Sequence, residues 1–471
     1  MSNLIQADYS KQLLFPPSIE DYLSEDDPVR FLREFIDSLD LKELGFEESE
    51  GEIGRPAYSV NLLLKVVIYG CFEGIRSFRS LERQCKRDVG LIWLTGMHYP
   101  DHNSIWRFYK KNKKSIKGIF QQSVKVALKN DLIGMLLNAV DGTRIKADVS
   151  DRNKISRKKL EGILSELDNI GDKLIEDLDR NNQTEIGEEE NKLPKELQDR
   201  EKLRKKIQDD LKELADNEAT QMHKTDKDAR TMRFIGNQFA LGYNCQIGVD
   251  STKGIITSAE TGQNAADSVY FGEMIEQSKL NTDGQTAETT VADAGYFSGK
   301  NLVDKGYEVL INIPSDYNQN KFIDKDSPYY VKNFDYDKQR DVYKCPQEKD
   351  LTFRRYQKGY NGSNYLGKIY KCSDYANCPV VKECTKLKDG RQICVNVHHQ
   401  IIEQQKIKQQ GVLNKDKLKK RREIVEPVFG YIKNILNYRR ATLRGLENVK
   451  SQWYLICTII NLRKIHKALY A

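Results

Sequence analysis

Three carboxylates occur in sequence contexts that suit metal-dependent phosphoryl transfer on DNA. Asp141 lies in "LLNAVDGTRIKAD", Asp293 in "ETTVADAGYFSG" and Glu426 in "RREIVEPVFGYIK". Both aspartates follow short apolar runs typical of β-strands, and the glutamate lies in a basic stretch typical of a helix. A carboxylate at the end of a buried strand packs poorly but is well placed to hold a hard cation such as Mg²⁺.

Each acid also has a purely structural interpretation. Asp141, followed by Gly142, would close its strand through an Asx turn. Asp293 would cap a helix that begins near Ser298. Glu426, followed by Pro427, would be a first-turn glutamate stabilised by the helix dipole. Any one acid alone is explained by such a role, whereas the three together favour a shared site.

The neighbours of Glu426 suit contact with phosphate. If the stretch is one helix, Arg422 at i−4 and Lys433 at i+7 lie on the same face as Glu426. Two cations beside a metal-binding carboxylate would grip a phosphate backbone. The alternative is an intrahelical ladder of salt bridges.

The elements that position these residues must come from a chain of 471 residues, long enough for two to four domains. The 76 Lys and Arg exceed the 69 Asp and Glu by a net +7, but the excess is uneven, because residues 401–471 hold 16 basic and 5 acidic residues. A second basic block is "SIWRFYKKNKKSIKG". Basic residues interleaved with aromatic ones suit a polyanion, while a solvated helix face is the plain alternative. The DNA-contact candidates in these stretches are Arg107, Lys110, Lys111, Arg439 and Arg440.

The composition argues against a secreted or membrane protein. The start "MSNLIQADYSK" has no apolar signal core, and the apolar segment "WYLICTIINL" is too short to span a bilayer. The nine cysteines are odd in number and unevenly spaced, unlike a disulfide framework. We expect a soluble cytoplasmic protein.

Residues 1–130 are predicted to form a helical domain. "SEDDPVRFLREFIDSL" offers Ser24 as an N-cap and Pro28 in the first turn. Three short helices follow in "SFRSLERQCKRD", "VGLIWLTG" and "DHNSIWRFYKKNKK", the order of a helix-turn-helix with a recognition helix. A plain helical bundle is the alternative.

Residues 131–313 and 401–471 are predicted to form an α/β core. Strand patterns occur in "LIGMLLNAVDGTRIKA", "FALGYNCQIGVDS", "KGIITSAET", "ETTVADAG" and "YEVLINIP". Helices are expected at "NAADSVYFGEMIEQSKL" and "SGKNLVDKG". Two hairpin-like strands followed by alternating helix and strand imply a mixed sheet with helices on its faces.

Two insertions interrupt this core. Residues 152–222 are charged, and their leucines recur at helical spacing on both sides of "NNQTEIGEEENKLP", which predicts an antiparallel coiled helical hairpin. Its role would be an arm for dimerisation or DNA contact, or it is only a tolerated surface insertion.

Residues 314–400 form the second insertion, which is rich in Tyr and Cys. Cys345, Cys372, Cys378 and Cys384 could bind a structural Zn²⁺ tetrahedrally, although their spacing lacks CxxC pairs. Cys394, His398 and His399 follow. Reduced structural cysteines are the alternative.

Several motifs in the order of the chain resemble the bacterial insertion-sequence transposases of the DDE superfamily. They are "DGTRIKA", "TDKDARTMRF" followed by "GYNCQIGVD", "ADAGYFSG" and "EPVFGYIKN", and the resemblance spans essentially the whole chain, roughly residues 10–467. The family pairs a helical N-terminal DNA-binding domain with an RNase H-like catalytic core. Its C-terminal signature of Tyr, Arg, Glu and Lys matches Arg422, Glu426 and Lys433, but Lys419 stands at the Tyr position.

The resemblance implies a function and a site. Asp141, Asp293 and Glu426 would bind two Mg²⁺ ions, with Mn²⁺ as a substitute, while Arg422 and Lys433 would hold phosphates. The protein would cut double-stranded DNA at terminal inverted repeats and join the ends to target DNA, at least as a homodimer and close to the bacterial nucleoid. A catalytically silent DNA-binding regulator and an RNase H-like nuclease without strand transfer are the alternatives.

Overall fold

The computed structural model describes residues 18–48, 56–149, 154–182, 195–216, 221–223, 225–303, 306–314, 326–358 and 366–470. Residues 183–194, which include the predicted acidic tip of the hairpin, lie outside the described residues. None of the described helices is long and apolar enough to cross a membrane.

The N-terminal region is helical, as predicted. A short 3₁₀ turn, η1 (Ile19–Tyr22), precedes six helices: α1 (Pro28–Asp37), α2 (Val60–Phe72), α3 (Phe78–Gln84), α4 (Val89–Leu94), α5 (His102–Asn112) and α6 (Ile116–Lys129). The predicted cap of α1 was wrong. The side chain of Asp27, not Ser24, accepts the hydrogen bond from the Val29 amide, because the helix begins directly at Pro28.

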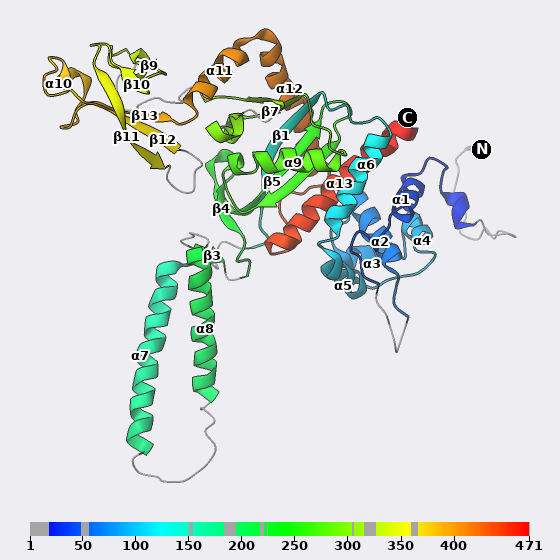
Figure 1. The fold of residues 1–471 in the computed structure, drawn as a ribbon. Helices are drawn as coiled ribbons and strands as arrows, with labels where there is room; N and C mark the ends of the chain where they lie inside the picture. Colours follow the sequence, from blue (N-terminus) through cyan, green and yellow to red (C-terminus); the bar gives the residue numbers. More distant parts are fainter. Residues whose placement is uncertain are drawn as a thin grey trace, which may run out of the picture.

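The core is a six-stranded mixed sheet (Figure 1). Its strands are β1 (Leu137–Lys146), β4 (Arg230–Arg233), β5 (Phe239–Asp250), β6 (Ile256–Gly262), β7 (Thr289–Ala292) and β8 (Glu308–Ile311). The order is β4-β5-β1-β7-β8, and β6 also pairs with β5. β5 pairs antiparallel with β1, β4 and β6, whereas β1–β7 and β7–β8 are parallel. The predicted RNase H-like sheet with flanking helices is confirmed.

Successive side chains of the central strands point to opposite faces of the sheet, where they pack into two separate hydrophobic cores. Val140, Ala292 and Ile311 pack with Phe271 and Met274 of α9 (Phe271–Asn281). Their neighbours Ala139, Val291 and Leu310 belong to the larger core on the other face. That core includes residues of α12 (Val412–Gly430) and α13 (Leu446–Tyr470). The sheet is therefore covered by α9 on one side and by C-terminal helices on the other.

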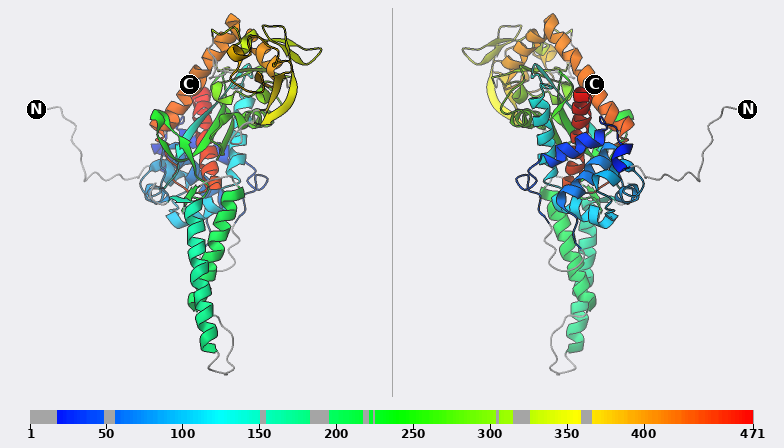
Figure 2. Two further views of the ribbon diagram at one scale, coloured as in Figure 1. Left: turned by 90° about the vertical axis from the view of Figure 1, so that its left-hand side faces the viewer. Right: turned by 90° about the vertical axis from the view of Figure 1, so that its right-hand side faces the viewer.

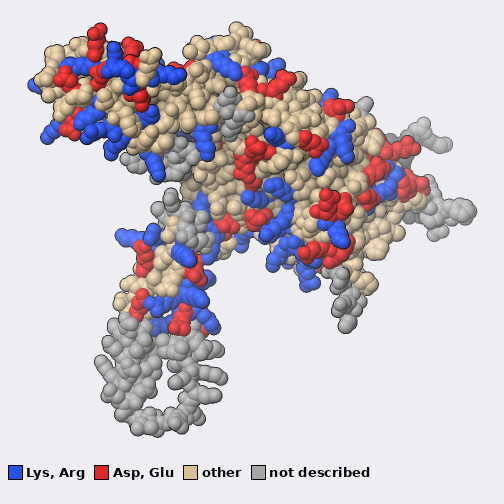
Figure 3. Space-filling model, viewed as in Figure 1, with Lys and Arg blue, Asp and Glu red and all other residues tan. Residues whose placement is uncertain are grey.

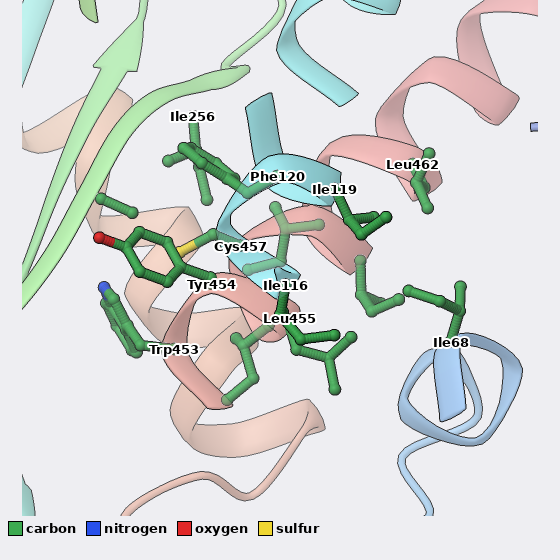
Figure 4. Close-up of a cluster of buried hydrophobic side chains, with 14 of the residues drawn as sticks. Ile68, Ile116, Ile119, Phe120, Ile256, Trp453, Tyr454, Leu455, Cys457 and Leu462 are labelled. Atoms are coloured by element: carbon green, nitrogen blue, oxygen red, sulfur yellow. The ribbon is translucent and has the colours of Figure 1, made fainter. Parts of the chain in front are cut away.

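Helix α13 joins the N-terminal helices to the sheet. In Figure 4 its Trp453, Tyr454 and Leu462 lie among Ile119 and Phe120 of α6, with Ile68 of α2 close by. All these residues belong to one continuous hydrophobic core. Outside this core, Arg76 donates to the carbonyl oxygens of Asn437 and Arg440 at 2.6 and 2.7 Å. The helical region is thus packed against the α/β core rather than tethered to it.

The first insertion is the predicted helical hairpin. Helices α7 (Arg157–Asn182) and α8 (Lys195–Asp216) rise from a two-stranded base of β2 (Lys154–Ser156) and β3 (Gln221–His223). Figures 1 and 2 show the hairpin projecting from the body as a long arm. Leu160, Ile207 and Leu214 are buried between its helices, so the two helices are held mainly by their own apolar seam.

The second insertion folds as a five-stranded antiparallel sheet at one end of the molecule (Figure 1). It consists of β9 (Asp335–Asp337), β10 (Val342–Lys344), β11 (Asp350–Lys358), β12 (Leu366–Cys372) and β13 (Gln392–Asn396), with the short turns η7 (Val331–Asn333) and α10 (Val381–Cys384). Aromatic side chains, including Tyr343 and Tyr370, form its own small core. The tyrosine-rich composition is therefore used for packing.

Helices and turns around the core complete the fold and correct one prediction. They are η3 (Ile235–Asn237), η4 (Asp267–Val269), η5 (Ala294–Tyr296), η6 (Gly299–Leu302), α11 (His399–Gln410) and η8 (Tyr431–Ile435), the last a π-helical turn. The helix expected at "SGKNLVDKG" is only the single turn η6, because Val303 has already returned to extended backbone.

Candidate active site

Strand register brings Asp141 and Asp293 together. In the parallel β1–β7 pair Val140 stands opposite Ala292, and each aspartate is the next residue of its chain. The Asp141 side chain leaves the sheet on the face opposite α9, since Val140 faces α9, whereas Asp293 follows the last residue of β7. The predicted neighbourhood of the two aspartates thus follows from the pairing of the two central strands.

The structural roles expected for the aspartates are only partly correct. Asp141 does not close its strand, since β1 continues through Gly142 to Lys146. A Cβ on Gly142 would lie 2.4 Å from the Gln246 side-chain amide, so glycine is needed here for close packing rather than for a turn. Asp293 does act as a cap, but of the short turn η5, where it accepts from the Gly295 amide at 2.8 Å.

Asp141 is a buried carboxylate with a cationic partner. Its side chain is 16% exposed and forms an ion pair with Arg421 of α12, which is 11% exposed. Burial, assisted by the charge of Asp293 and opposed by Arg421, raises the pKa of Asp141 to about 6. The site therefore holds negative charge in a partly desolvated position, as a cation-binding site requires.

Helix α12 carries Glu426 on a different face from Arg421. Arg421, Val425 and Val428 form the buried face of the helix. Glu426 is exposed, and at 3.6 residues per turn it lies about 140° around the helix from Arg421. The first-turn interpretation of Glu426 was wrong, because Pro427 lies inside a continuous helix of 19 residues that also contains Arg422.

Arg421 was missed by the sequence analysis, which chose its neighbour Arg422. Arg422 is exposed, and Arg421 is the residue that reaches Asp141. The i, i+4, i+7 spacing of Arg421, Val425 and Val428 was a usable signal, since an arginine in an apolar stripe faces the body of the protein.

Lys433 lies near Asp141, but α-helical spacing from Glu426 does not explain its position. It lies in the π-helical turn η8, beyond the end of α12, so the i+7 argument from Glu426 fails. Burial and the nearby Arg439 lower the pKa of Lys433, while the charge of Asp141 opposes them. Lys433 is therefore a half-buried cation within electrostatic range of Asp141.

The other basic candidates lie on the surface. Arg107, Lys110 and Lys111 are exposed on α5, and Lys111 pairs with Glu47 at 3.3 Å. Arg439 and Arg440 are exposed. The backbone of Arg440 forms a parallel β-bridge with Lys146 at the end of β1.

A further basic surface was missed in the Cys-containing insertion, where Lys and Arg are dense in Figure 3. Strand β11 exposes Arg354, Arg355 and Lys358 beside Phe353 and Tyr356. The run "FRRYQK" already showed this mixture of basic and aromatic residues, which suits nucleic acid.

The four candidate zinc ligands border the same cavity, but in the described part of the chain they are not grouped closely enough to form a metal site. Cys345, Cys372, Cys378 and Cys384 line one small cavity of about 20 Å³ in the insertion, although 39 residues separate the first from the last. Burial raises the pKa of Cys372 and of Cys384, and neighbouring thiols raise both further. Cys394 is exposed on β13, and His398 and His399 line a different pocket.

The donors around Asp141 and Asp293 suit a hard cation, but they are not preassembled. A Cβ on Gly295 would lie 3.0 Å from Asp293 Oδ1 and 3.1 Å from Asp267 Oδ2, so the glycine leaves a gap bordered by carboxylate oxygens. Oxygen donors of this kind are what Mg²⁺ and Mn²⁺ prefer. In the described ranges no three His, Cys, Asp or Glu side chains are grouped so that they could hold one metal ion.

Glu308 of β8 anchors the helix that carries Arg421 and Glu426. Its carboxylate pairs with Lys408 of α11 at 2.7 Å and with Lys417 of α12 at 2.8 Å. Partial burial alone would raise the pKa of Glu308, but the hydrogen bonds from Lys408, Lys417 and Thr289 outweigh it and lower the pKa to about 2. The position of α12 over the sheet is thus fixed by an ion-pair network.

The mixed sheet with flanking helices and the two aspartates on adjacent central strands are consistent with an RNase H-like transposase core. Residues 344–466 match the family model of a transposase DDE domain, and residues 17–111 match that of a transposase domain, DUF772. The resemblance to insertion-sequence DDE transposases is therefore confirmed. No curated protein matches the chain.

The matched families have general properties that bear on the function of the chain. A transposase DDE domain implies an enzyme that transposes DNA, such domains generally use divalent metals, and transposases bind DNA. The first match begins at Lys344 in β10, so most of the Cys-containing sheet belongs to the matched region. The match to the DDE domain includes Arg422, Glu426 and Lys433, whereas Asp141 and Asp293 lie outside both matched regions.

Proposed function

We propose that this protein is an active transposase that cleaves DNA at the inverted-repeat ends of an insertion sequence and transfers the freed strands. The observation that carries the proposal is the parallel register of β1 and β7, which sets Asp141 beside Asp293. The raised pKa of Asp141 and the cations Arg421 and Lys433 support it. Glu426, on the helix that packs over β1, is the proposed third carboxylate.

The side chains divide the work between cation and DNA. Asp141, Asp293 and Glu426 would hold two Mg²⁺ ions, or Mn²⁺ in their place. Bound metal would activate the attacking water or 3′-hydroxyl and stabilise the leaving oxygen. Lys433 and Arg422 would neutralise phosphate oxygens beside the scissile bond. Arg421 would keep Asp141 ionised before metal binds, since its charge lowers the pKa of Asp141.

DNA would contact several basic surfaces of the protein. Arg107, Lys110 and Lys111 on the helix-turn-helix-like segment α3–α5 would contact the terminal repeats. Arg439 and Arg440 lie nearer the site, at the end of β1. Pairing two transposon ends requires at least a dimer on DNA, and the protein would act at the bacterial nucleoid.

The test uses the full-length protein and a labelled duplex carrying the inverted repeats that flank its gene. Asp141→Asn, Asp293→Asn and Glu426→Gln should bind this duplex but not nick it in Mg²⁺. Glu423→Gln is the matched control, because Glu423 is an exposed glutamate on the same helix and should leave nicking unchanged. Nicking by any of the three variants at the wild-type rate would exclude that residue from the site.

The same assay separates the alternatives. Wild-type protein that binds the duplex but never nicks it in Mg²⁺ or Mn²⁺ would be a regulator. Wild-type protein that nicks without forming joined product would be a nuclease. Nicking followed by joining to a second duplex supports the transposase.

We also propose that Cys345, Cys372, Cys378 and Cys384 bind one structural Zn²⁺. Their convergence on one cavity supports this, and Lys349 lies within electrostatic range of Cys372 and Cys378, where it would offset thiolate charge. Purified protein should contain one equivalent of zinc, and Cys378→Ser should lose it while the exposed Cys394→Ser retains it. The site would be refuted if the wild-type protein is purified without zinc and its melting temperature is the same with and without a chelator.

A further inference from the structure

We infer that Asp267 is a positioning residue for Asp293, acting through a buried hydrogen-bond relay of Gln246 and Tyr296. The inference rests on the proposed function, because it assigns a role in aiming one of the proposed catalytic carboxylates. Asp267 lies in the turn η4 before α9, and its side chain is 16% exposed.

One oxygen of Asp267 fixes two side-chain amides of β5. Oδ1 accepts from Asn244 Nδ2 at 2.7 Å and from Gln246 Nε2 at 3.0 Å, and both amide side chains are fully buried. The other oxygen, Oδ2, faces Arg144 Nη2 at 3.5 Å. Because Oδ1 can only accept, it forces the Gln246 amide to point its nitrogen toward Asp267 and its oxygen away.

The oxygen of Gln246 then determines the position of the η5 turn. Gln246 Oε1 accepts a hydrogen bond from the hydroxyl of Tyr296, which is fully buried. Tyr296 closes the turn, since its amide donates to the Asp293 carbonyl at 3.2 Å. The same turn supplies the Gly295 amide that holds the Asp293 carboxylate. Asp267, Gln246 and Tyr296 therefore form a chain of contacts that ends at Asp293.

The relay also passes directly beside Gly142, the residue that follows Asp141 in β1. Gln246 stands opposite Gly142 in the β1–β5 pair. A Cβ on Gly142 would lie 2.4 Å from Gln246 Nε2 and 3.1 Å from Asp267 Oδ1. Burial raises the pKa of Tyr296 well above its usual range, and the negative charges of Asp267, Asp141 and Asp293 add to this effect. The hydroxyl of Tyr296 therefore remains a hydrogen-bond donor. Both proposed catalytic strands are thus supported by one buried polar network.

The experiment distinguishes a relay from a direct role of the Asp267 charge. Asp267→Ala and Tyr296→Phe break the relay at its two ends, and Asp267→Asn keeps an oxygen acceptor for the amides without the charge. Tyr454→Phe is the control, because it removes another buried tyrosine hydroxyl that hydrogen-bonds to Glu260 at 3.1 Å. Each full-length variant is assayed for single-turnover nicking of the inverted-repeat duplex and for hydrogen exchange in residues 289–303.

If the relay positions Asp293, both end variants should slow nicking roughly 10- to 100-fold with unchanged DNA binding. The double variant should be no slower than either single variant, since both remove the same unit. Asp267→Asn should remain within a few-fold of wild type. Faster exchange in residues 289–303 is expected for both end variants and not for Tyr454→Phe.

Three results would overturn the inference: Asp267→Asn as slow as Asp267→Ala, multiplicative losses in the double variant, or unchanged exchange in both end variants. Wild-type protein that never nicks would refute the proposed function instead. The exchange measurement would then still decide whether Asp267 and Tyr296 fix the turn at Asp293.

Discussion

Replacing Glu308 by Gln should loosen the attachment of α12 to the sheet. The change removes the charge that pairs with Lys408 and Lys417 while keeping the shape of the side chain. A pKa lowered from 4.5 to about 2 corresponds to at most about 3 kcal/mol of stability at neutral pH. Glu308 is 22% exposed, so we expect solvent screening to reduce the cost to about 1–2 kcal/mol.

The pH dependence of this cost has a definite sign. The pKa of Glu308 is lower in the folded protein, so its stabilisation is complete above pH 4.5 and is lost as the pH falls toward 2. Urea unfolding of wild type and Glu308→Gln should therefore differ at pH 7 and converge as the pH is lowered below 4.5. Hydrogen exchange should rise in α12, and nicking should slow because Arg421 and Glu426 lie on that helix.

The matched control is Glu161→Gln, which breaks an exposed i, i+4 pair with Arg157 in the hairpin. We expect this change to cost less than about 0.5 kcal/mol. If Glu308→Gln is no more destabilising than Glu161→Gln, or if its cost at pH 3 is as large as at pH 7, the assignment of Glu308 as the anchor of α12 is wrong.

Three further changes test buried positions of the core. Trp453→Phe should cost about 2–3 kcal/mol in urea unfolding, because it opens a cavity and removes the hydrogen bond to the Gln246 carbonyl at 2.9 Å; a cost below that of an ordinary surface change would contradict this. Gly142→Ala should abolish nicking while the protein stays folded by circular dichroism, since its Cβ would displace Gln246, and wild-type nicking would show that the close approach is dispensable. Burial lowers the pKa of Lys464 to about 8, so Lys464→Met should stabilise the protein by about 1–3 kcal/mol at pH 7. That gain should fade as the pH rises from 8 toward 10.5, and equal gains at pH 7 and pH 10 would refute the role of its charge.

The two proposals depend on different parts of the molecule. The zinc site lies in the antiparallel sheet of the insertion, and the relay lies between β1, β5 and η5. Loss of zinc should therefore leave exchange in residues 289–303 unchanged, and Asp267→Ala should leave the zinc content unchanged.

Local patterns in the sequence predicted the elements well. Short apolar runs indicated the strands around Asp141 and Asp293, and leucine spacing indicated the hairpin. These patterns succeed because side-chain periodicity reflects which face of one element is buried, and that is a local property. The ordered motifs also indicated the transposase resemblance, which the two family matches confirm.

Partners between distant elements were not predictable from such patterns. The helical spacing favoured Arg422, but the helix that crosses β1 turns Arg421 toward Asp141 instead. Lys433 depends on a π turn, and Asp267 depends on Gly142 and Gly295 leaving space for its carboxylate. The sequence by itself determined the strands that lead to Asp141 and Asp293, and it indicated the class of protein. Only the tertiary structure decided which cation, amide and hydroxyl meet each carboxylate, because those contacts depend on how helices α9 and α12 are rotated and seated on the sheet.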